Sequence, residues 1–158
     1  MCGYLGRVTQ RVIDFATIGS FYQTAQYSYH KSATGGWDTL YVSEYTVSIG
    51  NSASDTASDT ATYRYTYDDV GNITHIHDGN GNLLYRYTYD ALGQLTREDN
   101  APLEKTYVYT YDNAGNRTFK RTYAFTTGTP SSLQGMVRYT YGDNSWGDLL
   151  TSYGDWKY

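Results

Sequence analysis

The sequence predicts an all-β chain built from repeated antiparallel hairpins. Three observations carry this prediction. A 12-residue tract at Tyr63–Thr74 (YRYTYDDVGNIT) recurs at 85–96 and at 107–118, each copy 22 residues after the last. Tyrosine occupies alternate positions in every copy, as in a strand. No segment shows apolar residues at the period of a helix. A fixed period of this length is typical of units that must stack on their neighbours to bury their apolar faces.

The first half of each copy predicts a strand that carries its three tyrosines on one face. Arg64 and Thr66 then lie on the other face, because successive side chains of a strand alternate. Tyr and Thr are also favoured in strands. We expect Tyr65, Tyr87 and Tyr109 to stack as neighbours in successive hairpins. The seven positions identical in all copies form the repeat motif: Tyr63, Tyr65, Thr66, Tyr67, Asp68, Gly71 and Thr74; Tyr85, Tyr87, Thr88, Tyr89, Asp90, Gly93 and Thr96; Tyr107, Tyr109, Thr110, Tyr111, Asp112, Gly115 and Thr118.

A turn follows each of these strands at the conserved Asp. An Asp side chain can hydrogen-bond the backbone two residues on, and a Gly three positions later can take a positive φ. We therefore expect positive φ at Gly71, Gly93 and Gly115. A second strand then begins at Asn72, Gln94 or Asn116, so that each unit contains two strands and two turns.

The segment Asp78–Asn82 (DGNGN) is a further turn signal, and it also resembles the start of a calcium loop. Its sixth position is Leu83 rather than Gly, and its twelfth is Tyr89 rather than Glu. The bidentate ligand of such a loop is therefore missing. We predict an ordinary Asn/Gly turn here and no calcium.

The rest of the chain follows the same plan less regularly. Residues 1–62 are expected to be degenerate repeats, with strands at 27–29 and 44–49, a turn at 34–38 and a mobile Ser/Thr/Ala/Asp loop at 51–61. Residues 63–125 hold the three regular repeats. Residues 126–158 are expected to form a loop at 126–135 and a degenerate repeat around Tyr139 and Tyr141. We interpret the whole as one continuous array from a longer protein.

The composition indicates what kind of core the chain has and which classes of partner it excludes. The 20 tyrosines supply apolar area in rigid rings whose hydroxyls need partners, so an aromatic, hydrogen-bonded core is expected. A formal charge of −4, with cations spread along the strands, argues against nucleic acid. No apolar run reaches the length of a membrane span, and a single cysteine, Cys2, excludes a disulfide framework within the chain.

No catalytic, metal or cofactor site is predicted. His75 and His77 share one strand face, but two ligands do not make a metal site, and an exposed polar face explains them. Each repeat Asp already has a structural role, and no cluster of Ser, His or Cys stands beside it. The aromatic residues Trp37, Trp146 and Trp156 are the candidates for stacking on a ligand such as a sugar ring.

The pattern Tyr-x-Tyr-Thr-Tyr-Asp-x-x-Gly-Asn/Gln-x-Thr resembles the YD repeat of the Rhs family, also found in toxin-complex C components and teneurins. The resemblance implies a spiralling sheet of hairpins that closes into a hollow shell, often around a C-terminal toxin, in a secreted or surface-associated protein. Two family features are missing. The prolines, Pro102 and Pro130, are not in the Asp-Pro-x-Gly motif that supports self-cleavage, and no toxin domain is expected within residues 1–158, because the repeat pattern extends to the last of them.

Two functional interpretations remain open. In the first, the chain is a non-enzymatic structural segment of a β-shell whose partners are flanking repeats, or other copies that associate through exposed strand edges. In the second, it is a module that binds cell-surface glycans. A shell segment is expected to have covered tyrosine faces, and a binding module to leave a row of Tyr or Trp open to solvent.

Overall fold

A computed structural model describes residues 7–15, 21–34, 38–51, 56–143 and 145–158. The chain divides into two compact units, Met1–Leu83 and Leu84–Tyr158. The predicted all-β fold is confirmed, because the regular elements of the described residues are all strands. Within the described residues, no helix is long and apolar enough to cross a membrane.

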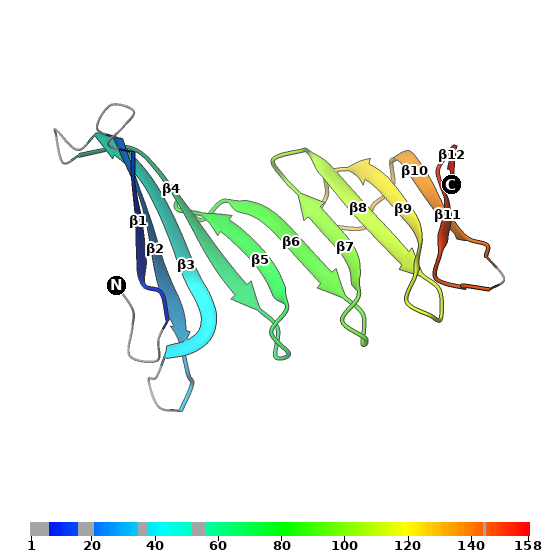
Figure 1. Cartoon of the computed structure of the whole chain (residues 1–158), viewed down its shortest axis with the longest axis horizontal. Coiled ribbons are helices and arrows are strands. Elements are labelled where there is room, and N and C mark those ends of the chain that lie inside the picture. The colour runs from blue at the N-terminus through cyan, green and yellow to red at the C-terminus, as the bar shows by residue number, and fades with distance from the viewer. Residues whose placement is uncertain (1–6, 16–20, 35–37, 52–55, 144) are drawn as a thin grey trace. The chain divides into compact units, whose positions relative to one another are not determined.

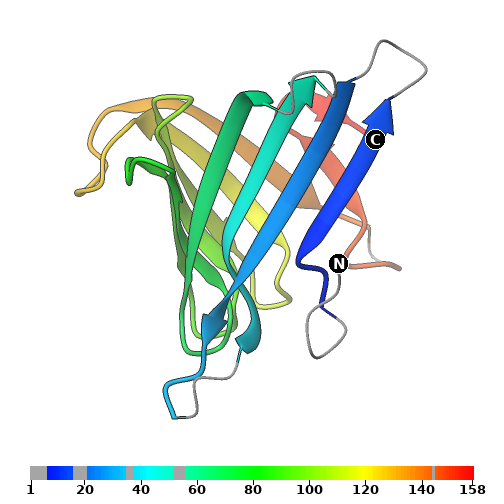
Figure 2. The same ribbon diagram turned by 90° about the vertical axis from the view of Figure 1, so that its left-hand side faces the viewer.

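The first unit is a sheet in which each strand pairs antiparallel with the next one along the chain. Its neighbouring strands can be followed in the blue to green ribbon of Figure 2. The strands are β1 (Gln10–Phe15), β2 (Phe21–Lys31), β3 (Asp38–Asn51), β4 (Thr56–Tyr67) and β5 (Ile73–Asp78).

The second unit continues the same hairpin plan, again with antiparallel pairing between sequence neighbours. The turns after β6 and β8 lie at one end of the strands, and the turn after β7 lies at the opposite end (Figure 1). The strands are β6 (Leu83–Tyr89), whose first residue is the last of the first unit, β7 (Leu95–Asn100), β8 (Lys105–Tyr111), β9 (Arg117–Ala124), β10 (Leu133–Tyr141), β11 (Leu150–Tyr153) and β12 (Trp156–Lys157).

The loop expected at 51–61 is wrong over most of its length, because β4 begins at Thr56. Thr60 lies opposite Ser48, and Ala61 lies opposite Val47 of β3. Small and polar composition suggested a loop, but threonine is a good strand residue and the long β3 offers it a pairing partner. Residues 52–55 lie outside the described part.

The second predicted loop is shorter than expected. Strand β10 begins at Leu133 rather than after residue 135, and Gly135 pairs with Thr122 across a register shift. The expected strands at 27–29 and 44–49 are confirmed as parts of β2 and β3. Of the turn expected at 34–38, residues 35–37 are not described.

The core is thin. Among the described residues only two apolar side chains, Ala25 and Tyr109, are buried, whereas Asp99, Asn100 and Thr106 are buried polar residues. Most tyrosines of the repeats are half-buried. The hairpins are therefore held by ladder hydrogen bonds and by contacts between neighbouring strands, with little closed apolar interior.

Candidate functional site: aspartate turns, tyrosine face and a pinned loop

The conserved Asp of the repeat organises its turn through three kinds of hydrogen bond. The backbone N–H of Gly71 donates to the carbonyl of Asp68 (3.1 Å), and the N–H of Asp68 donates to the carbonyl of Asn72 (2.9 Å). One carboxylate oxygen of Asp68 accepts from the N–H groups of Val70 (3.1 Å) and Asn72 (2.8 Å). The other accepts from the Asn72 side-chain amide (2.9 Å). The side chain thus replaces backbone partners that a tight turn leaves unpaired.

The same geometry recurs in the turns of the other repeats. It also recurs at 78–82, the segment that resembles the start of a calcium loop. Turns at 90–94 and 112–116 repeat both backbone bonds and both N–H bonds to the carboxylate. At 78–82 both oxygens of Asp78 accept hydrogen bonds, including one from the Asn82 amide (2.8 Å). The described residues contain no cluster of three or more potential metal-ligating His, Cys, Asp or Glu side chains.

These bonds favour the charged carboxylates. Side-chain hydrogen bonds from Asn72 and Asn82 lower the pKa of Asp68 and Asp78, respectively, and the Asn116 backbone N–H lowers the pKa of Asp112. The expected positive φ is present at Gly71 (95°), Gly93 (77°) and Gly115 (87°). The turn part of the repeat motif is therefore a self-contained structural device.

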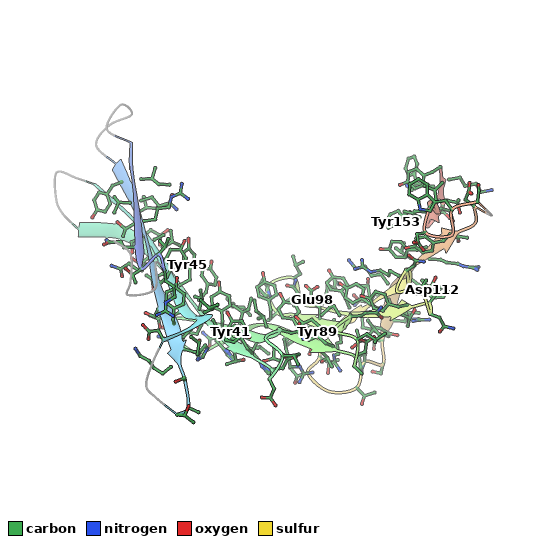
Figure 3. All side chains as sticks on the ribbon, turned by 60° about the horizontal axis from the view of Figure 1, so that its bottom comes forward. Tyr41, Tyr45, Tyr89, Glu98, Asp112 and Tyr153 are labelled. Carbon is green, nitrogen blue, oxygen red and sulfur yellow. The ribbon has the colours of Figure 1, made fainter. Side chains whose placement is uncertain are left out.

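Tyrosines of the first unit form a ladder that spans three strands. Tyr27 lies opposite Tyr45, and Tyr45 lies opposite Tyr63. The ring centroids are 5.1 Å and 6.2 Å apart, respectively. Tyr45, the middle residue of the ladder, is labelled in Figure 3. Sequence reasoning missed this ladder because it compared equivalent positions of the regular repeats. The Tyr-x-Tyr pattern at 27–29 and the single Tyr45 were its only signals.

In the second unit, a carboxylate separates the repeat tyrosines. Tyr87 lies opposite Glu98 of β7, and Glu98 lies opposite Tyr107 of β8. The expected stacking of Tyr87 on Tyr109 as immediate neighbours is wrong, because β7 lies between their strands. Tyr109 instead donates its hydroxyl to Glu98 (3.1 Å). Burial, with the nearby Glu98 charge, raises the pKa of Tyr109.

Beyond β8, cationic side chains lie over the tyrosine rings of this face. The Arg117 guanidinium carbon lies 4.7 Å from the ring centroid of Tyr109 and 5.7 Å from that of Tyr139. The Lys120 ammonium lies 4.1 Å from the ring centroid of Tyr107. Cation–π contacts of this kind stabilise a face that is rich in rings and poor in aliphatic residues.

The conserved threonines link the two strands of each hairpin. The hydroxyls of Thr66 and Thr74 are 3.1 Å apart, and those of Thr110 and Thr118 are 2.9 Å apart. In the middle repeat, Thr96 instead donates to the Thr88 carbonyl (3.0 Å). Each hairpin therefore has a threonine contact close to its turn, a role that the sequence pattern alone did not assign.

A buried carboxylate pins the loop at 125–132. Asp99 is fully buried and forms ion pairs with Arg86 (2.6 Å) and Arg97 (2.8 Å). It also accepts from the Thr106 hydroxyl (3.0 Å).

The two arginines of this cluster also donate hydrogen bonds to backbone carbonyls of the loop. Arg86 donates to the Thr127 carbonyl (2.6 Å), and Arg97 donates to the carbonyls of Thr126 and Gly128 (both 2.7 Å). Sequence reasoning missed the cluster because it spans the three strands β6, β7 and β8, and because Arg97 and Asp99 have no counterparts in the other copies of the repeat.

Two of the three candidate ligand-stacking residues lie within the described ranges. Trp146 and Trp156 are exposed, at 66% and 74%, and Trp37 lies outside the described residues. His75 and His77 stack with ring centroids 5.9 Å apart. A shallow depression in the first unit is lined by Tyr27, Val42, Tyr45, Tyr65, Tyr67 and Ile73.

Comparison with known families identifies the repeats. The family model described as RHS Repeat matches residues 67–101 and 89–127, two segments that begin 22 residues apart. The starts of the two matches coincide with the third tyrosine of the first and second copies. A search of curated proteins returned no match.

Solved structures with a similar chain path include a Tc holotoxin pore of Photorhabdus luminescens that carries a mutation in TccC3. It is 16% identical, with a TM-score of 0.43, over 77% of this chain and 6% of that one. A TcdB2-TccC3-Cdc42 complex is 17% identical (TM-score 0.32, 86% and 9% coverage). TcdB2-TccC3 without its hypervariable C-terminal region is 16% identical (TM-score 0.32, 86% and 8% coverage). The chain thus spans less than a tenth of these structures' chains.

Proposed function

Because residues 67–127 are RHS repeats, we propose that the chain is a non-catalytic wall segment, meaning a run of hairpins that forms part of a larger β-shell. Its partners in this proposal are flanking repeats of the parent protein. The family resemblance extends the proposal to a secreted or surface-associated parent whose shell encloses a toxin domain.

The observation that carries this proposal is the lack of an apolar interior in the described residues. A domain normally closes its core between two layers, but here only Ala25 and Tyr109 are buried apolar residues. The fold is stabilised instead by contacts between consecutive strands, namely stacked tyrosines, paired threonines and backbone hydrogen bonds. Such an array gains stability with each added neighbour, as a wall requires.

The turn carboxylates also support a structural role. Asp68, Asp78 and Asp112 each use both oxygens inside their own turns. A carboxylate engaged in this way is held in place for the backbone rather than presented to a substrate.

Light scattering on the isolated chain tests the proposal. A wall segment exposes unpaired strand edges, so we expect concentration-dependent association that decreases when flanking repeats of the parent are added. Unfolding of the same two proteins by denaturant should show the longer chain to be the more stable. A monomer at every concentration, with no gain in stability from flanking repeats, would contradict the proposal and favour a self-contained binding module.

A further inference from the structure

A basic stretch interrupts this acidic chain. Between Asp112 and Asp143 there is no Asp or Glu, whereas four cations occur: Arg117, Lys120, Arg121 and Arg138. The chain as a whole has a formal charge of −4. The local excess of positive charge lies on β9 and β10, which are neighbours in the sheet.

The register of β9 divides these cations between two faces, because a shift between Arg117 and Phe119 brings Arg117 to the same face as Lys120. Arg117 and Lys120 lie on the tyrosine face, over the rings of Tyr109 and Tyr107. Arg121 and Arg138 lie on the opposite face with Phe119. Arg138 of β10 lies directly opposite Phe119 of β9. Arg121 lies on β9, two positions after Phe119.

Phe119 positions both guanidinium groups on that face. Their central carbons are 4.8 Å (Arg121) and 6.0 Å (Arg138) from the Phe119 ring centroid. Contact with an aromatic ring restrains the guanidinium group of an arginine without using its N–H donors. Met136, opposite Arg121 and 56% exposed, adds an apolar surface beside them.

These two arginines differ from others in the molecule. Arg64 pairs with Glu44, and Arg86 and Arg97 pair with Asp99. Within the described ranges, Arg121 and Arg138 form no ion pair. Carboxylates of the fold therefore pair with the first three arginines. The guanidinium groups of Arg121 and Arg138 are available to bind an external anion.

We propose that the patch formed by Phe119, Arg121 and Arg138 binds an extended acidic segment of a partner protein. Carboxylates match the arginine fork with two parallel hydrogen bonds. A strand-like peptide suits an open sheet surface, and its apolar side chains have Phe119 and Met136 to contact. Nucleic acid is disfavoured, because phosphate binding of useful strength needs more cations than this face offers.

Fluorescence anisotropy with a labelled peptide of alternating Glu and Leu tests the proposal. We expect the double variant Arg121→Gln/Arg138→Gln to bind this probe at least about tenfold more weakly than the parent chain. The matched control, Arg11→Gln/Lys120→Gln, removes the same charge from β1 and from the opposite face of β9. It should retain affinity within about twofold.

Two further measurements keep the result decisive. Phe119→Leu retains both charges but loses the stacking surface, so weaker binding is expected with an unchanged circular dichroism spectrum. A probe with Gln in place of Glu should not bind. Equal affinity of the parent and the double variant would overturn the proposal, as would tighter binding to a short DNA duplex or to phosphatidylserine vesicles than to the acidic peptide. The assay is independent of wall assembly, so its outcome is separate from that of the proposed function.

Discussion

At the scale of single residues, the repeat motif separates into positions with distinct physical tasks. The Asp accepts the turn's N–H groups, the Gly allows its left-handed backbone, the Thr links the two strands and the Tyr residues cover one face. Sequence reasoning predicted the tasks of Asp and Gly because both depend on local chain geometry. The threonine contacts depend on register, which the periodic pattern alone does not specify.

The turn glycines provide a direct test. Gly93 has φ of 77° and open space where a side chain would start, so Gly93→Val isolates the cost of backbone strain. We expect a loss of about 1–2 kcal/mol in the free energy of unfolding, measured with denaturant. Gly135→Val, in strand β10 with open space and no positive φ, is the control and should change stability far less. Equal losses in the two variants would refute the strained-turn explanation.

The turn carboxylates predict how stability depends on pH. Folding lowers the pKa of Asp68, Asp78 and Asp112, so the unfolded chain binds protons more readily than the folded one. Their stabilisation is therefore present above the unfolded pKa of about 4 and is lost as pH falls through the lower folded values. Melting temperatures between neutral pH and about pH 2.5 should show a fall that is smaller in the triple Asp→Asn variant. Parallel curves for the two proteins would contradict the prediction.

At the scale of elements, the sequence predicts the regular hairpins well and the contacts between them poorly. The strands of the three repeats follow from alternation and turn chemistry, which are local. The Tyr27–Tyr45–Tyr63 ladder and the Arg86–Asp99 ion pair join residues from different strands, so their register had to be known first. The loop expected at 51–61 was wrong for a related reason, because the pairing offered by β3 outweighed local composition.

The contact between Tyr109 and Glu98 is a test of how adjacent elements hold together. Tyr109 is only 7% exposed, and Tyr109→Ala should lower the free energy of unfolding by about 2–4 kcal/mol. Tyr109→Phe keeps the ring and loses only the hydrogen bond to Glu98, so about 1 kcal/mol is expected. Tyr158→Ala, at a position that is 80% exposed, serves as the control and should have little effect. A similar cost for Tyr109→Ala and Tyr158→Ala would show that the tyrosine face does not hold the strands.

The pinned loop predicts a larger and more local effect. Asp99→Ala leaves Arg86 and Arg97 without their carboxylate, and we expect a loss of about 2–4 kcal/mol, moderated because both guanidinium groups are partly exposed. Limited proteolysis should then cut within 125–132 faster than in the parent chain. The exposed Asp155→Ala is the matched control. Unchanged cleavage of the loop in Asp99→Ala would mean that the arginines hold it without the carboxylate.

At the scale of the whole molecule, a repeat array differs from a closed domain in how its stability depends on length. Within each unit, every strand pairs with its neighbours in sequence, and the described residues enclose almost no common core. The free energy is then a sum of hairpin and interface contributions, so a correctly phased extra unit adds one of each. Correct phase means a full 22 residues, since an odd insertion would move every tyrosine to the opposite face.

Insertion of a second copy of residues 63–84 between Leu84 and Tyr85 tests this property. In the duplicated chain, Leu83 and Leu84 precede a new Tyr63 as they now precede Tyr85 at the start of β6. The insertion leaves both the Tyr27–Tyr45–Tyr63 ladder and the Asp99 cluster within intact sequence. We expect a folded β-protein with a higher denaturant midpoint than the parent, measured by circular dichroism. A closed domain would instead lose stability, because 22 extra residues would disrupt its single core. A scrambled insert of the same composition controls for length and should lower the midpoint. If the duplicated chain were no more stable than the scrambled one, stability could not be a sum over neighbouring hairpins, and the central physical argument for a wall segment would fail.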